Sequence, residues 1–182
     1  MSRAGQACLA AIALLTLPAT AQAHRLDEYL QATTFSLAPD HVAVHLRLTP
    51  GVDVAPGVIR QIDRNGDGHL SGREQKSYAA HIMQTLSLSL NGQAGYLHLQ
   101  AMTFPSLAAM QASTGVIDLE LKMRARFREG NNHLAYQNQG NGPETVWLVN
   151  CLLPQNSAIH VIQQRRAPDQ SSYELDFSTI AP

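Results

Sequence analysis

The sequence lacks an excess of charge of either sign. Its 182 residues include 13 Lys and Arg and 14 Asp and Glu, so the formal net charge at pH 7 is -1. Proteins that bind nucleic acids present a basic patch or stripe to the phosphate backbone. We therefore expect no nucleic-acid partner. The length and the 45% hydrophobic content fit a single globular domain that buries one sizeable core.

Cysteine is scarce as well. The sequence contains Cys8 and Cys151, and Cys8 falls in a segment that we expect to be removed from the mature protein. A single remaining thiol excludes a scaffold built on internal disulfides. Cys151 lies within the apolar run 146–153, where a buried and unreactive thiol is expected.

The sequence also has no hydrophobic run of the roughly 20 residues that cross a bilayer. The weakly apolar run at residues 7–17 follows Arg3, and the small residues of the Ala-Gln-Ala segment 21–23 suit a signal peptidase. These features predict a secretory signal peptide over residues 1–23, cleaved after Ala23. We therefore expect an exported protein of the bacterial periplasm that begins at His24 and has no transmembrane segment in its mature chain.

Apolar and polar residues alternate with a period of two in much of the mature chain. Residues 117–127 place apolar side chains at odd positions and charged ones at even positions, which is typical of a strand with one solvated face. Asn91-Gly92 is a preferred hairpin turn between the alternating segments 86–90 and 97–99. Further strands are predicted at residues 29–37, 42–48, 146–153, 158–163 and 173–177.

Seven or eight short strands separated by Gly, Pro and Asn favour a mainly β fold. We predict an antiparallel β-sandwich or barrel-like domain over residues 24–182. One stretch, at about residues 53–86, departs from the pattern because its apolar residues recur with helical spacing on both sides of a polar loop. The domain is therefore expected to contain an inserted helix-loop-helix.

The polar loop spans residues 63–74 and reads Asp-Arg-Asn-Gly-Asp-Gly-His-Leu-Ser-Gly-Arg-Glu. Gly68, its sixth residue, suits a sharp turn that side chains with a Cβ atom rarely adopt. Ser71 and Glu74 also form the S-x-x-E pattern that starts a helix. The expected ligands are side-chain oxygens at five positions and the backbone carbonyl of a sixth residue: Asp63, Asn65, Asp67, His69 (carbonyl), Ser71 and Glu74.

This loop and its flanking helices resemble the EF-hand superfamily over about residues 54–86. The resemblance implies an all-oxygen shell that binds Ca²⁺. Only three carboxylates face the ion, Arg64 and Arg73 lie nearby with the opposite charge, and the sequence has no second loop of this kind. We therefore expect a weak site.

A second resemblance covers the mature start of the chain, HRLDEYLQATTFSLAPDHVAVHLRLTPGVDV, together with the single loop and the strands that follow. This layout looks like the extracytoplasmic N-terminal domain of bacterial HupE/UreJ-like or nickel/cobalt transporter-like membrane proteins. Because no hydrophobic span follows before Pro182, we expect no transport activity from the residues printed here.

The mature N-terminus offers an alternative metal site. His24 would carry an α-amine and an imidazole, which together could chelate Cu, Ni or Co, and seven further histidines could complete the shell. No pair of histidines has the close helical or strand spacing of a preformed site. The competing hypothesis is therefore a periplasmic accessory protein that binds a transition metal through His24.

Sequence motifs give no support to an enzyme. No nucleophile elbow, H-E-x-x-H motif or glycine-rich phosphate loop occurs, and the sequence predicts no catalytic residue. The hypothesis that these observations favour is a secreted, periplasmic calcium-binding domain with one EF-hand and a structural or partner-binding role. The protein partner is not identified by any motif.

Overall fold

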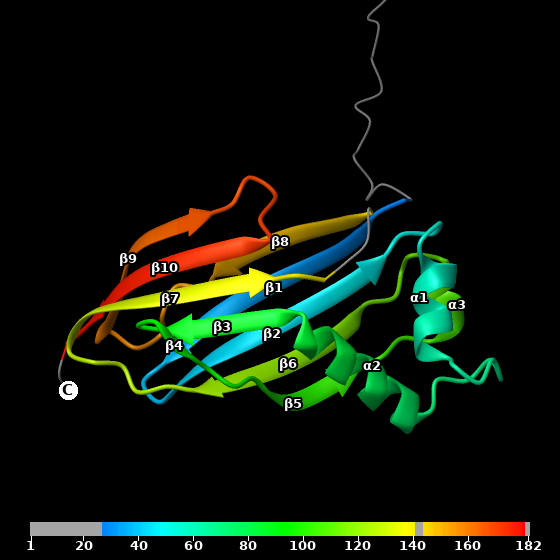
Figure 1. The fold of residues 1–182 in the computed structure, drawn as a ribbon, viewed down its shortest axis with the longest axis horizontal. Coiled ribbons are helices and arrows are strands. Elements are labelled where there is room, and N and C mark those ends of the chain that lie inside the picture. The colour runs from blue at the N-terminus through cyan, green and yellow to red at the C-terminus, as the bar shows by residue number, and fades with distance from the viewer. Residues whose placement is uncertain (1–26, 141–143, 181–182) are drawn as a thin grey trace, which may run out of the picture.

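The computed structural model describes residues 27–140 and 144–180, and their fold is mainly β (Figure 1). The expected signal peptide, residues 1–23, and the candidate ligand His24 lie outside the described residues. Among the described helices, none combines the length and apolar character needed to cross a membrane.

Ten strands and three helices make up the described part of the chain. The strands are β1 (Tyr29–Ala38), β2 (His41–Pro50), β3 (Leu86–Leu90), β4 (Gln93–Ala94), β5 (His98–Thr103), β6 (Ile117–Arg124), β7 (Gly130–Asn138), β8 (Thr145–Cys151), β9 (Ile159–Arg166) and β10 (Ser172–Thr179). The helices are α1 (Ala55–Ile62), α2 (Gly72–Gln84) and α3 (Leu107–Gln111).

The strands form two sheets of five strands each, with the orders β5-β6-β2-β1-β8 and β4-β3-β7-β10-β9. The two layers are the architecture of a sandwich, so the sandwich prediction is confirmed over the barrel-like alternative. The pairing is antiparallel throughout except between β1 and β8, which run parallel. The predicted antiparallel pairing is therefore present between the described strands except at this edge, where a long connection rather than a hairpin brings β8 beside β1.

Aromatic side chains fill the space between the sheets. Phe35 of β1 is fully buried and stacks against Tyr173 of the opposite sheet, with ring centroids 5.6 Å apart. Its ring also meets the Tyr136 ring edge-on at a centroid distance of 5.0 Å. The Tyr136 hydroxyl lies 2.9 Å from Thr33 Oγ1, which gives this polar tip a partner inside the core. The two layers are thus joined by packing and by a hydrogen bond.

The predicted turn at Asn91-Gly92 is present, and both residues have positive φ angles of 53° and 79°. These angles suit a type I′ turn, whose twist matches that of the flanking strands. The returning strand differs from the prediction, because after the turn only the two residues of β4 pair with β3. Leu99 instead belongs to β5, which pairs with β6 in the other sheet. The chain therefore leaves the hairpin after two residues and crosses between the layers.

All three helices gather at one end of the sandwich (Figure 1). The inward side of α1 buries Val58 and Ile62, and that of α2 buries Tyr78, Ala79 and Ile82. Burial of these apolar side chains supplies most of the stability of helices this short, because isolated helices of such lengths are marginal in water. The segment between the two helices is thereby held against the end of the sheets.

Replacing Phe35 with alanine should lower the free energy of unfolding by about 3 to 5 kcal/mol, because the change leaves a cavity between the sheets. Urea denaturation followed by tryptophan fluorescence measures this loss. Thr34→Ala, on the opposite face of the same strand, is the matched control and should change stability by less than about 0.5 kcal/mol. Equal effects of the two substitutions would contradict the assignment of Phe35 to the inter-sheet core.

Candidate metal-binding loop and adjoining cavity

Residues 63–71 connect α1 to α2, and residues 72–74, the last three of the candidate loop, form the first turn of α2. Ser71 caps α2, and its Oγ accepts a hydrogen bond from the backbone N–H of Glu74 at 3.3 Å. The Glu74 carboxylate accepts one in return from the Ser71 backbone N–H at 3.0 Å. This reciprocal capping box was predicted from the sequence and is confirmed. It fixes the start of α2 and the last turn of the loop.

Asp63 organises the first half of the loop. Its carboxylate oxygens accept hydrogen bonds from the backbone N–H groups of Gly66 at 2.9 Å and Gly68 at 3.0 Å. Gly68 has a φ angle of +78°, a left-handed conformation that favours glycine, as the sequence pattern requires at this position. The chain is thus curled around the first carboxylate of the loop.

Asn65 and Asp67 continue the same pattern. Asn65 Oδ1 accepts from the backbone N–H of Asp67 at 3.1 Å, and Asn65 Nδ2 donates to Asp67 Oδ2 at 2.8 Å. Asp67 Oδ1 in turn accepts from the backbone N–H of His69 at 2.8 Å. The exposed imidazole of His69 takes no part in these contacts, so this residue enters the loop through its main chain.

Glu74 joins the two ends of the loop. Its Oε1 accepts from the backbone N–H of Arg64 at 3.2 Å, while its Oε2 accepts from Ser71 Oγ at 2.6 Å. The residue is only 8% exposed. The side-chain and backbone hydrogen bonds from Ser71 lower the pKa of the Glu74 carboxyl below its usual value. Glu74, which is expected to supply both carboxylate oxygens to an ion, is therefore ionised at neutral pH and directed toward the backbone of the loop.

All six predicted ligand residues lie in this one loop, in the order the sequence implies. Their carboxylates are held by backbone N–H groups, and nowhere in residues 27–140 and 144–180 are three or more His, Cys, Asp or Glu side chains placed to hold a metal ion as they stand. Capture of a cation would therefore require carboxylates to turn from these partners toward a common point.

The described histidines are dispersed over the fold. His98 and His160 are exposed on β5 and β9, and His81 is exposed on α2. Three others pair with carboxylates: His41 with Asp40, His45 with Asp118 and His133 with Asp176. Sequence reasoning did not anticipate these pairs, since their partners are set by strand register or by a turn.

Cys151 is buried at the end of β8, as expected. Burial raises the pKa of its thiol to about 11, which keeps the thiol protonated at neutral pH. A protonated buried thiol is a poor nucleophile and a poor metal ligand. The residue belongs to the core.

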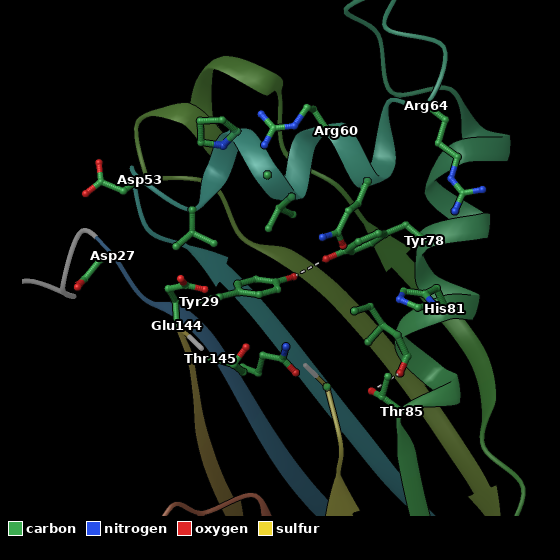
Figure 2. Close-up of a pocket in the computed structure, with 18 of the residues that line it drawn as sticks. Asp27, Tyr29, Asp53, Arg60, Arg64, Tyr78, His81, Thr85, Glu144 and Thr145 are labelled. Atoms are coloured by element: carbon green, nitrogen blue, oxygen red, sulfur yellow. Dashed lines mark hydrogen bonds between the residues drawn. The ribbon is translucent and has the colours of Figure 1, made fainter. Parts of the chain in front are cut away.

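A cavity of about 680 Å³ adjoins the loop, between the two helices and the end of the sheets (Figure 2). Tyr29 of β1 and Tyr78 of α2 meet there, with their hydroxyl oxygens 2.7 Å apart. Arg64, the second residue of the loop, also lines this cavity. The cavity was missed by sequence reasoning because its walls come from segments that are distant along the chain.

The chain matches no protein-family model, and the search of curated proteins finds no match either.

Protonation of Glu74 should weaken the fold at acid pH. Because its folded pKa is lowered, its stabilising contribution is fully present above the unfolded value of about 4.3 and is lost as the pH falls through the folded value. Urea midpoints measured from pH 6 to pH 3 should fall more steeply for the wild type than for Glu74→Gln, which retains a capping side chain. Parallel pH profiles for the wild type and Glu74→Gln would refute this role. The control is Glu120→Gln on the outer face of β6, whose pH profile should match that of the wild type.

Proposed function

We propose that this protein is an extracytoplasmic calcium-binding domain whose loop 63–74 holds the ion. The observation that carries the proposal is the placement of the first and last carboxylates of the loop. Asp63 curls the first half of the loop around itself, and Glu74 reaches from the start of α2 to the backbone at Arg64. The carboxylates at the first and last positions of an EF-hand-like ligand set thus both contact the backbone of the loop.

The chemistry of the donors supports Ca²⁺ over softer ions. The side chains of Asp63, Asn65, Asp67, Ser71 and Glu74 offer only oxygen as a ligand. Hard divalent cations prefer such shells, and Ca²⁺ accepts the six to eight flexible oxygen ligands that a loop of this kind supplies. Copper and nickel favour nitrogen or sulfur ligands. The loop contains no cysteine, and the imidazole of its one histidine, His69, is exposed and makes no contact within the loop.

Charge sets the expected strength of the site. Three carboxylates repel one another as they converge, and binding of a divalent cation relieves that repulsion. Arg64 and Arg73 are exposed beside the loop and oppose the cation. A dissociation constant between about 10⁻⁵ and 10⁻³ M follows, the range of weak sensors and extracellular modules. Such a site fills where Ca²⁺ is abundant, which agrees with the export that the sequence of residues 1–23 predicts.

The packing of the flanking helices favours a structural brace over a switch. Val58 and Ile62 anchor α1, while Tyr78 and Ile82 anchor α2. Thr85 then leads α2 directly into β3. Opening the helices as a calcium sensor does would expose these buried side chains, so ion binding is expected to tighten the loop instead.

Calcium should raise the melting temperature of the mature protein. At about 100 times the dissociation constant, binding stabilises the folded state by roughly 2.7 kcal/mol. Glu74→Gln should remove most of this calcium-dependent shift, because an amide cannot supply two anionic oxygens. Differential scanning calorimetry with millimolar CaCl₂ and with a chelator measures the shift. Glu120→Gln removes one carboxylate far from the loop and should respond as the wild type does.

Two outcomes would contradict the proposal. The first is an unchanged melting temperature of the wild type in Ca²⁺ and in chelator. The second is a calorimetric titration in which Cu²⁺ or Ni²⁺ binds tightly and Ca²⁺ does not, which would favour the competing site at His24. A rise in hydrophobic-dye binding on addition of Ca²⁺ would show that the ion exposes apolar surface, which would contradict the structural role and favour a calcium sensor.

A further inference from the structure

The cavity beneath α1 and α2 separates charges of opposite sign. Figure 2 shows Asp27, Asp53 and Glu144 at one end, Arg64 and His81 at the other, and Arg60 of α1 on the wall between them. The three acidic residues precede β1, α1 and β8, whereas Arg64 belongs to the loop and His81 to α2. Five segments of the chain thus converge to make a hollow with a negative and a positive end.

These charged side chains make no ion pairs with one another. Within the described residues, no salt bridge or side-chain hydrogen bond links the side chain of Asp53, Glu144, Arg64 or His81 to another residue. Charges that line one hollow and are not neutralised by the fold remain available to a ligand. Each end can therefore attract a group of the opposite sign.

The floor of the cavity adds polar groups that the fold leaves partly unused. Only one hydroxyl proton is needed for the contact between Tyr29 and Tyr78, so the second proton remains free to be donated. Gln31 is 2% exposed, and its Oε1 accepts a hydrogen bond from Asn138 Nδ2 at 2.8 Å. Tyr29, Gln31 and Tyr78 all line the cavity, so the free hydroxyl proton is available to a ligand there.

The size of the cavity restricts the ligand further. Cavities that bind small molecules enclose about 300 to 1,000 Å³. A sphere of 680 Å³ is about 11 Å across, the length of roughly three extended residues. A free amino acid, whose charges are separated by a single carbon, is too short to reach both ends.

We propose that this cavity binds a short peptide with free termini, of about three residues. The peptide ammonium group lies at the end formed by Asp27, Asp53 and Glu144, and its carboxylate lies beside Arg64 on the side of His81. The backbone of the peptide accepts a hydrogen bond from the Tyr29–Tyr78 pair. Binding at this cavity does not require an ion in the loop.

Isothermal titration of the mature chain with trialanine tests the proposal. The experiment is run in chelator, so that its result is independent of calcium binding. A dissociation constant below about 1 mM is expected for the peptide with both termini free. N-acetyl-trialanine and trialanine amide each lack one terminal charge and should bind at least tenfold more weakly. Alanine itself should bind more weakly than trialanine.

Variants locate the two ends of the peptide. Asp53→Asn should weaken trialanine binding and should reduce the loss that N-acetylation causes, because both changes remove the same ammonium contact. Arg64→Gln should do the same for C-terminal amidation. Lys76→Gln on the outer side of α2 and Glu120→Gln on β6 are exposed, lie outside the cavity and should bind as the wild type does.

Three results would overturn the proposal. They are the absence of trialanine binding by the wild type at concentrations up to about 10 mM, equal binding of the free and capped peptides, and equal binding of alanine and trialanine. Circular dichroism spectra of each variant are compared with that of the wild type, so that a loss of binding is distinguished from unfolding of the variant.

Discussion

The hydroxyl pair of Tyr29 and Tyr78 connects the helical segment to the sandwich. Burial raises the pKa of Tyr78 to about 12 and that of Tyr29 well above its usual value, so both remain neutral at physiological pH. The contact fixes the position of α2 relative to β1, and with it one wall of the cavity. Glu74 belongs both to the loop and to the first turn of α2, and Arg64 of the loop lines the cavity. The position of α2 therefore affects the geometry of the loop and of the cavity together.

The elements of the fold were predictable where alternation was strict. β6 follows such a pattern and was predicted, whereas β7 was missed because its short alternation around Leu134 and Tyr136 is surrounded by polar residues. The order of the strands was not predictable, nor was the parallel pairing of β1 with β8. These features depend on contacts between segments far apart in sequence, which the local pattern of residues does not encode.

The candidate loop was predictable because its ligands follow one another along the chain. The capping box of Ser71 and Glu74 and the left-handed Gly68 appear where the sequence pattern requires them. The partners of the carboxylates were not predictable, since backbone N–H groups that hold Asp63 and Asp67 become donors only when the loop has curled. The cavity gave no sequence signal, because Asp53 and Glu144 are brought together only by the fold.

Hydrogen exchange tests most directly whether the loop is closed by a bound ion. The backbone N–H groups of Gly66, Gly68 and His69 donate to loop carboxylates and lie at the surface. Amide exchange of the mature chain is measured by mass spectrometry with millimolar Ca²⁺ and with chelator. We predict slower exchange in residues 63–74 with Ca²⁺ and unchanged exchange in β1 and β7. Identical exchange of residues 63–74 in the two conditions would contradict calcium binding by this loop.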